Sequence, residues 1–312
     1  MRIGLDVSGG DFAPQATIDG ALLAKKELGE SVTVVLFGDE LIIQKELASR
    51  SVNASLFEIV HAPEVISYND HPTRALPRKP NSSISLGFDH LAKGLIDVFA
   101  SNGNTGAMLV GSMFKLHTVP GVIRPCITST LPTINDGKTV LLDVGSNADC
   151  KSDVLYQFAL LGATYAEGVL GIENPKVALL NIGEEDSKGN LICIATHKLL
   201  ADSDELNFIG NIEARDLFTG VADVIVCDGY TGNIVLKEAE GIFSLMKQRG
   251  IQDAYFDRFN YENYGGTPVL GVKGNAIIGH GISNDIAVKN MLLHSAEVVQ
   301  NKLTEKINKV FN

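Results

Sequence analysis

Short polar turns, each punctuated by glycine, contain the residues of this chain that are best suited to hold an anion. Five of them follow an apolar run and precede a helical pattern, and they read DVSGGD at 6–11, GNTG at 103–106, GEEDSKGN at 183–190, DGYTGN at 228–233 and GHGISN at 279–284. Glycine lets the backbone approach a ligand, and the helix that follows offers unpaired N–H groups. In an α/β sheet such turns meet at the carboxyl edge of the strands. The pattern therefore predicts a site for a phosphate or for a developing oxyanion.

Three side chains in the later turns are candidate catalytic residues. Lys188 is a cation able to neutralise a phosphate or an oxyanion at the sheet edge. Asn233 is suited to polarise a carbonyl group, and Asp228 to orient either of the other two side chains. The structural alternatives are a surface ion pair for Lys188 and a helix cap for Asn233.

The turn at 103–106 supplies the candidate phosphate-binding residues Asn104, Thr105 and Gly106. Their backbone N–H groups open a helical pattern directly after a strand pattern, which is the arrangement that binds phosphate in many α/β proteins. A tight structural turn, in which Thr105 only caps the helix, is the alternative.

The first and last of the five turns supply an additional candidate site. Its residues are Gly9, Gly10, Asp11, His280 and Asn284. His280 stands between two glycines, where it acts either as a general acid or ligand-binding group or as a histidine satisfied within its own turn.

The charge of the chain excludes several kinds of partner. With 37 acidic and 26 basic residues the formal net charge is -11, so broad attraction to nucleic acid or to anionic lipid is not expected. The densest positive charge is at Arg74, Arg78 and Lys79, in a polar, proline-containing stretch at 61–80 that is predicted to be a long functional loop. The chain begins with a strand pattern rather than an apolar leader, which predicts a cytoplasmic protein.

Neither a metal nor an organic cofactor is expected. The four cysteines, at 126, 150, 193 and 227, are far apart and form no C-x-x-C pair, which favours reduced core thiols. The G-x-G-x-x-G, G-x-x-x-x-G-K-[ST], H-E-x-x-H and G-x-S-x-G signatures are absent. An H-x-x-x-x-D pattern at His197 and Asp202 matches membrane-bound glycerol-phosphate acyltransferases, but it has no companion motif and we interpret it as a coincidence.

Strand and helix patterns alternate along the chain and predict an α/β fold with its polar turns along one edge. Apolar runs at 139–144, 177–182 and 221–227 fit strands that are buried on both faces. The last helix is expected to run from 284 to 310 with a continuous apolar stripe. The whole chain, 1–312, is predicted to be one domain, with a division into two lobes as the alternative.

Seven segments of the chain resemble the bacterial phosphate acyltransferase (PlsX) family, in family order over nearly the whole length. They are DVSGGDFAP at 6–14, SNGNTGA at 101–107, LDVGSN at 142–147, NIGEEDSKGN at 181–190, NFIGNIEARD at 207–216, DGYTGNIVLK at 228–237 and GHGISN at 279–284. The resemblance implies a Rossmann-like α/β/α sandwich of the isopropylmalate dehydrogenase and phosphotransacetylase type, and a homodimer. It also supports Lys188, Asp228 and Asn233 as functional positions.

The activity that this resemblance implies is the formation of acyl phosphate from acyl-[acyl carrier protein] and inorganic phosphate, in phospholipid biosynthesis. The carrier is acidic, so Arg74, Arg78 and Lys79 are its expected docking surface. The implied setting is the cytoplasm, either free or peripheral at the inner membrane face, with coupling to a membrane glycerol-3-phosphate acyltransferase. Three alternatives stay open: a phosphotransacetylase-like enzyme that uses acyl-CoA, a β-decarboxylating dehydrogenase on the same fold, and a non-catalytic carrier-binding scaffold.

The chain departs from the family pattern in two places. Ser8 and Phe12 stand where the family usually has Met and His, so no role is expected for a histidine in the first turn. The helical excursion near 234–264 is shortened, with only about a dozen residues between the helical pattern at 234–246 and the stretch at 261–266. Because the family uses this region for membrane contact and dimer packing, the short segment predicts a mainly soluble protein.

Overall fold

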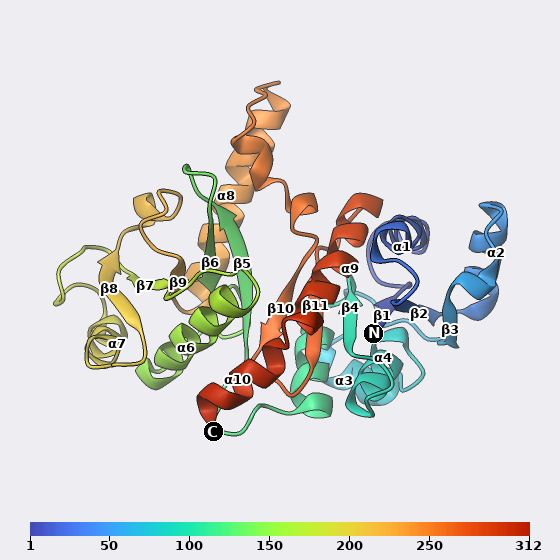
Figure 1. The fold of residues 1–312 in the computed structure, drawn as a ribbon, viewed down its shortest axis with the longest axis horizontal. Coiled ribbons are helices and arrows are strands. Elements are labelled where there is room, and N and C mark those ends of the chain that lie inside the picture. Colours follow the sequence, from blue (N-terminus) through green and yellow to red (C-terminus); the bar gives the residue numbers. More distant parts are fainter. The chain divides into compact units, whose positions relative to one another are not determined.

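The computed structural model describes all residues from Met1 to Asn312, and they form two compact units. Unit 1 comprises Met1–His117 and Tyr261–Asn301, and unit 2 comprises Thr118–Asn260 and Lys302–Asn312. Each unit contains a sheet flanked by helices, so the predicted α/β class is confirmed (Figure 1).

The sheet of unit 1 is parallel apart from one strand at its edge. Its strands, in spatial order, are β3 (Glu58–His61), β2 (Thr33–Gly38), β1 (Arg2–Asp6), β4 (Val98–Ser101), β11 (Asn275–Gly279) and β10 (Gly266–Leu270). All neighbours are parallel except β10 and β11. The central strands β1 and β4 are almost entirely buried, because helices cover both of their faces.

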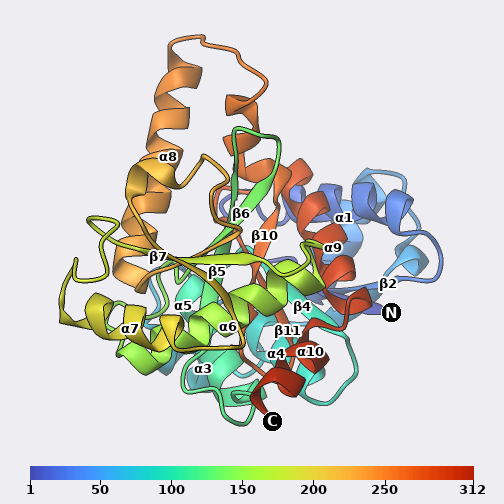
Figure 2. The same cartoon turned by 60° about the vertical axis from the view of Figure 1, so that its left-hand side comes forward.

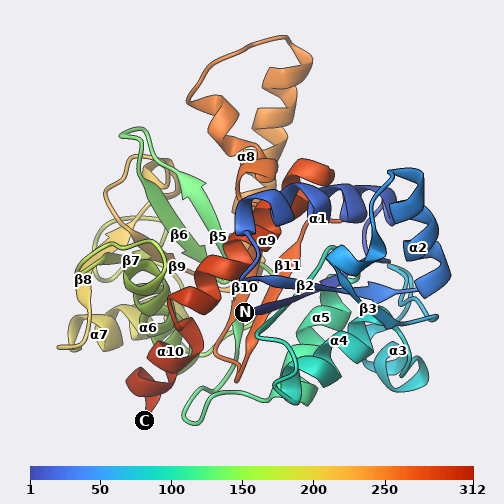
Figure 3. The same cartoon turned by 45° about the vertical axis from the view of Figure 1, so that its right-hand side comes forward.

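Two long helices lie side by side on one face of this sheet, and a shorter one covers the other face (Figure 3). The pair is α1 (Gln15–Leu28) and α9 (Asp285–Gln300), and the shorter helix is α4 (Ser83–Ala92). The pair packs closely because Gly20 has no side chain: a Cβ there would lie 2.5 Å from Val288 Cβ. The remaining helices are α2 (Glu40–Ser49), α3 (Pro72–Arg78) and α5 (Thr105–Gly111), which continues as a π turn at Ser112–Leu116.

The sheet of unit 2 repeats this design. Its strands, in spatial order, are β5 (Cys126–Pro132), β6 (Lys138–Leu142), β9 (Val224–Val226), β7 (Lys176–Leu180) and β8 (Asn207–Ile212), and only β5 is antiparallel to its neighbour. The helices are α6 (Ser152–Gly168), α7 (Leu191–Ala201), α8 (Gly229–Gln248) and α10 (Leu303–Phe311). Figure 2 shows α8 extending well beyond the strands of its own unit. Short 3₁₀ turns occur in the chain at Ala54–Leu56, Ala214–Asp216, Phe256–Phe259 and Tyr261–Asn263.

Two predictions about the elements are wrong. The stretch at 61–80 is not one long loop, because α3 forms within it with Pro72 at its first position, where proline is tolerated. The predicted helix at 284–310 is broken at Lys302, whose φ of 53° is left-handed and ends helical geometry. Its two halves, α9 and α10, belong to different units.

None of the helices combines the length and the apolar composition that crossing a lipid bilayer requires.

Candidate functional site

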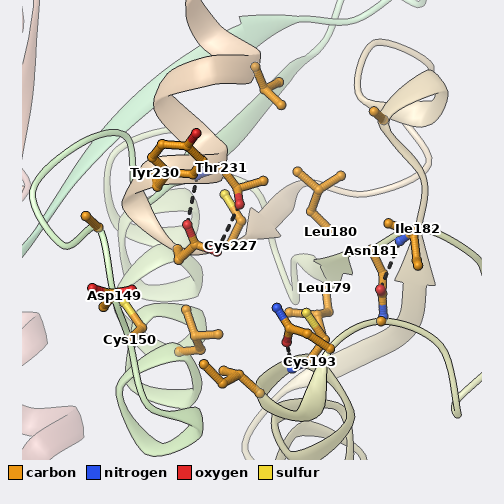
Figure 4. A pocket seen from close by; sticks show the side chains of 18 residues that line it. Asp149, Cys150, Leu179, Leu180, Asn181, Ile182, Cys193, Cys227, Tyr230 and Thr231 are labelled. Atoms are coloured by element: carbon orange, nitrogen blue, oxygen red, sulfur yellow. Dashed lines mark hydrogen bonds between the residues drawn. The ribbon is translucent and has the colours of Figure 1, made fainter.

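A cavity of about 840 Å³ lies in unit 2, at the carboxyl ends of the parallel neighbours β6, β9 and β7. Three turns that follow these strands line it, at 148–150, 181–190 and 228–231, together with the first turn of α7. Figure 4 shows their side chains around the cavity. Ligands of α/β sheets bind at this edge, so the cavity is the candidate active site of the unit.

Asp228 lies on the cavity wall and begins helix α8. One of its carboxylate oxygens accepts a hydrogen bond from the backbone N–H of Thr231 at 2.8 Å, and the other accepts one from the Thr231 hydroxyl at 2.9 Å (Figure 4). This is the N-cap geometry of an aspartate, which stabilises the start of the helix. The N-terminus of α8 therefore forms one wall of the cavity.

The LDVGSN segment at 142–147 packs against the N-terminus of α8, and the buried carboxylate of Asp143 holds this segment in place. One oxygen accepts from the backbone N–H of Ile127 at 3.1 Å and from the Ser146 hydroxyl at 2.7 Å, and the other accepts from the Asn147 backbone N–H at 2.6 Å. Helix α8 packs directly on this turn: a Cβ at Gly232 would lie 2.0 Å from the Asp143 backbone oxygen. Only glycine permits so close an approach.

Lys188 lies in the turn between β7 and α7, next in the chain to the cavity-lining residues Gly189 and Asn190. Its side chain is about half exposed, and its ammonium lies 3.9 Å from Glu185 Oε1. The cavity-lining Asn181 holds the turn by donating a hydrogen bond to the Lys188 carbonyl at 3.1 Å. Asn233 is exposed on α8 beside Gly145. No hydrogen bond or ion pair joins Lys188, Asp228 and Asn233 to one another, although all three belong to this edge of unit 2.

The histidine of the H-x-x-x-x-D pattern, His197, contacts the turn that carries Lys188 and stabilises its position in unit 2. His197 is buried on α7; its Nε2 lies 3.2 Å from Asp186 Oδ1, and its Nδ1 lies 3.1 Å from Asn211 Oδ1. Asn211 in turn donates to the Glu185 carbonyl at 2.9 Å. The histidine thus has a structural role in this turn, which its sequence pattern did not indicate.

Three of the four cysteines line the cavity, and burial keeps their thiols protonated. Desolvation raises the pKa of Cys150 to about 12, raises the pKa of Cys193, and raises that of the deeply buried Cys227 well above the ordinary value. A thiol is nucleophilic as the thiolate, so burial lowers the reactivity of these side chains at neutral pH. No group of three or more His, Cys, Asp or Glu side chains is arranged to hold a metal ion.

The raised pKa of Cys150 predicts slow alkylation of this thiol in the native protein. For Cys150, a pKa raised from 9.0 to about 12 lowers the thiolate fraction about 1,000-fold, and the alkylation rate should fall in proportion. Iodoacetamide at pH 8, followed by mass spectrometry of the peptides, measures this rate in native and in urea-unfolded protein. Equal rates in both states would show that the thiols are exposed.

The same shift predicts a pH dependence of stability. Because folding raises the pKa of Cys150, the contribution of this thiol to the free energy of unfolding is present below pH 9 and is lost as the pH rises toward 12.

In unit 1, three glycine-containing turns meet at the carboxyl ends of the parallel neighbours β1, β4 and β11. Asp6 ends β1 and is buried; it accepts hydrogen bonds from the Ser101 hydroxyl at 2.7 Å and from the Ser8 N–H at 3.0 Å. Burial raises the pKa of this carboxyl group. The backbone N–H of Asp11 donates to the Gly281 carbonyl at 2.8 Å, which joins the first and last turns. The turn that holds Gly9 and Gly10 therefore lies beside the one that holds His280.

His280 and Asn284 both contact the segment that precedes β10. The His280 ring centroid lies 5.2 Å from that of Tyr261. The Asn284 side-chain oxygen accepts from the Ala287 N–H at 3.0 Å and caps α9, while its amide nitrogen donates to Glu262 at 3.0 Å. Asn284 thus has a capping role in the structure.

The Asn104 side chain is fully engaged within unit 1. Its oxygen caps α5 by accepting from the Ala107 N–H at 2.9 Å, and its nitrogen donates to the carbonyls of Ser67 at 2.9 Å and Asp70 at 3.2 Å. Thr105 and Gly106 follow in the first turn of α5, where backbone N–H groups have no partner within the helix. Any anion at this turn would therefore be held by the backbone rather than by the Asn104 amide.

The three basic residues of the predicted docking surface differ in their surroundings. Lys79 is engaged: its ammonium lies 2.5 Å from Asp70 Oδ2 and 2.8 Å from the Val65 carbonyl, and this contact lowers the pKa of Asp70. Arg74 and Arg78 are exposed on α3. The structure thus leaves two of the three cations available to an external partner.

Asn102 is a candidate that the sequence did not single out. It is 1% exposed, and neither its amide nitrogen nor its amide oxygen has a hydrogen-bond partner. Buried polar groups are nearly always paired, so an orphaned amide between the turns of Gly10 and Gly279 marks a special position. Its place within SNGNTGA, one of the segments that carry the resemblance, was the only signal available in advance.

The fold places the chain in the structural class of the phosphotransacetylases. A phosphotransacetylase from Streptococcus pyogenes matches with a TM-score of 0.67 at 16% identity, covering 96% of this chain and 94% of that one. A 4-hydroxythreonine-4-phosphate dehydrogenase from Klebsiella pneumoniae matches with a TM-score of 0.60 at 12% identity, covering 96% and 99%. Likeness at such identities shows the fold alone, which is the predicted type.

The family is shown by sequence. Residues 1–306 match the family model described as "Fatty acid synthesis protein". A phosphate acyltransferase of Dictyoglomus thermophilum is 42% identical, and one of Desulforamulus reducens is 43% identical, each match covering 98% of this chain and 96% of the relative. The chain belongs to this phosphate acyltransferase family, as its seven segments indicated.

Proposed function

We propose that this protein transfers the acyl group of acyl-[acyl carrier protein] to inorganic phosphate, and so supplies acyl phosphate to phospholipid biosynthesis. The observation that carries the proposal is the family match over residues 1–306, together with relatives above 40% identity that are named phosphate acyltransferase. The cavity at the sheet edge of unit 2 supports the proposal, because ligands of α/β sheets bind at this edge.

The reaction needs charge stabilisation more than it needs a base. A phosphate oxygen, already anionic at neutral pH, attacks the thioester carbonyl carbon and forms a tetrahedral oxyanion. The oxyanion then collapses, the carbon–sulfur bond breaks, and the carrier thiolate leaves with the electron pair and takes a proton from solvent. The protein must hold two anionic groups together and stabilise the oxyanion, which is the task of positioned donors and cations.

The proposed roles follow from where the residues lie. Lys188, half exposed in the turn that precedes α7, neutralises the phosphate or the oxyanion. Asn233 polarises the carbonyl group. Asp228 orients Asn233 indirectly, because both of its oxygens accept from Thr231 and so fix the N-terminus of α8, the helix that carries Asn233. Burial holds the thiols of Cys150 and Cys227 protonated, and the proposed nucleophile is phosphate itself, with no covalent acyl-enzyme.

In unit 1, the first-turn N–H groups of Thr105 and Gly106 and the backbone of Asn104 remain our proposed phosphate-binding groups. The turns of Gly9, Gly10 and Asp11 and of His280 and Asn284 remain a proposed additional site, supported by the hydrogen bond that joins the two turns.

The second candidate is an acyl-CoA:phosphate acyltransferase, which the phosphotransacetylase fold favours. Purified protein should be incubated with phosphate and either palmitoyl-carrier protein or acetyl-CoA, and acyl phosphate trapped as the hydroxamate. The carrier-linked substrate is expected to react. Product from acetyl-CoA alone would replace the proposal with the second candidate.

Carrier docking is predicted to depend on Arg74 and Arg78, the exposed cations of α3. Reversing both to glutamate should raise the KM for acyl-carrier protein about tenfold at low salt and leave kcat unchanged, because surface charges steer an acidic partner without touching the reaction. Lys79 is left intact because Asp70 binds it. The matched control reverses Lys26 and Lys45, two exposed lysines of unit 1 elsewhere on its surface. An equal rise in KM for both double variants would place docking elsewhere.

We also propose a cytoplasmic homodimer, working beside the inner membrane face and handing its product to a membrane glycerol-3-phosphate acyltransferase. Apolar side chains exposed on α8 support an intermolecular contact: Ile234, Ile242 and Leu245 are 50%, 50% and 61% exposed. Sedimentation velocity tests the dimer, and flotation with anionic liposomes tests the membrane contact.

A further inference from the structure

Several polar side chains that line the cavity of unit 2 already make hydrogen bonds within their own turns. Asp228 is bound by Thr231, and the Asn190 side chain accepts from the Cys193 N–H at 2.9 Å. The Asn181 amide donates to the Lys188 carbonyl and accepts from the Ile182 N–H at 2.9 Å. These groups hold their own turns in place, so the cavity does not need a polar ligand to satisfy them.

The interior of the cavity is apolar. Leu155, Leu179, Leu180 and Val235 face it together with the protonated thiols, as Figure 4 shows for Leu179 and Leu180. Its volume of about 840 Å³ lies within the range of small-molecule sites, roughly 300–1,000 Å³. A long aliphatic chain is the ligand for which such a lining is favourable.

The charges around the cavity also restrict its occupant. No lysine, arginine or histidine side chain lines it, whereas Asp149 and Asp228 do. An anionic group that entered the cavity itself would meet these two carboxylates, so charged groups are better placed outside it, at the turn of Lys188. The neutral chain of a thioester carries no charge and meets no such barrier.

We propose that this cavity binds the acyl chain of the substrate, with the thioester carbon at the rim formed by Asp228 and the turn of Lys188. The inference rests on the proposed function, and it adds where the acyl chain of the substrate binds and which side chains contact it. Apolar side chains extend from the rim into solvent, since Ile182, Leu191 and Tyr230 are 79%, 86% and 65% exposed, and they offer the chain a path inward. Burial raises the pKa of the lining thiols Cys150 and Cys193, so little thiolate is present to exchange with the thioester.

Filling the cavity should shorten the chains that the enzyme accepts. Cys193 lies in the first turn of α7 and faces the cavity, so Cys193→Trp removes space without touching a residue to which a catalytic role is assigned. Each methylene excluded from an apolar site weakens binding about fourfold, and loss of room for two lowers the palmitoyl-to-butyryl ratio of kcat/KM roughly 15-fold. The matched control is Leu199→Trp, on the same helix but away from the cavity, which should keep the ratio.

A binding measurement makes the test independent of turnover. The natural chain has no tryptophan, so Ile192→Trp, at a lining position that is 40% exposed, introduces a single reporter. Its emission should shift to the blue when S-hexadecyl pantetheine, a thioether that cannot react, is added, and Leu199→Trp should not respond. An unchanged chain-length ratio in folded Cys193→Trp, or no shift for Ile192→Trp, overturns the proposal. A blue shift in a protein that makes no acyl phosphate would instead uphold the cavity and refute the proposed function.

Discussion

Replacing Lys188 with alanine should lower kcat by about 10²–10³-fold, with little change in the free energy of unfolding. The ammonium is half exposed, and its single ionic contact, with Glu185 at 3.9 Å, is too long and too solvated to stabilise the fold. In the proposed reaction, however, it faces two anionic groups at a site that the acyl chain shields from water. Removal of one such electrostatic group has effects of this size in acyl-transfer enzymes.

Two measurements separate this role from a structural one. Initial rates of acyl phosphate formation give kcat and KM, and urea unfolding gives the stability of the same preparation. Lys138→Ala is the matched control, because Lys138 is an exposed lysine of unit 2 at the opposite, amino end of β6. Near-normal turnover by Lys188→Ala would remove this residue from the mechanism.

Replacing Asp143 with alanine should have the largest effect on stability, a loss of about 3 kcal/mol or more. The carboxylate is fully buried, and its loss leaves the N–H groups of Ile127 and Asn147 and the Ser146 hydroxyl without their acceptor. Each orphaned donor costs about 1–3 kcal/mol. Activity should fall as well, because the turn of Asp143 supports the N-terminus of α8 beneath Gly232.

Urea unfolding of unit 2 measures this loss, and Asp149→Ala serves as its control. Asp149 lies on the same connection and lines the cavity, yet its side chain makes no hydrogen bond within the fold. Similar stabilities for the two variants would show that the buried network contributes little to the fold.

The sequence predicted the α/β class and the positions of the polar turns, because both depend on local residue types. Glycine and small polar residues mark the places where the chain leaves β1, β4 and β11 in unit 1. Elements that depend on distant contacts were harder to predict. Strand β10 contains Pro268, which weakens the strand pattern, and it is held by its antiparallel neighbour β11. The break between α9 and α10 at Lys302 could not be predicted either, because no proline or glycine stands there.

The candidate functional site could also be predicted only in part. A motif identifies which residues stand at the sheet edge but not how their side chains are used. Asp228 caps α8 through a local contact with Thr231. The Asn104 amide donates to the carbonyl of Ser67, 37 residues away, and such a tertiary contact cannot be predicted from a local motif. The cavity itself is formed by residues of separate turns and helices. Leu155 of α6 and Cys193 of α7 are among them, and their apolar character does not distinguish them from any core residue in the sequence.

The most direct test of the account is whether release of the carrier thiol requires phosphate. Palmitoyl-carrier protein should be mixed with a molar equivalent of enzyme, first without phosphate and then with it, and free thiol and acyl phosphate measured in parallel. Direct attack by phosphate predicts no thiol release in its absence, and then one acyl phosphate for each thiol once phosphate is added. Release of one thiol per enzyme without phosphate, with the acyl group retained on the protein, would contradict the account.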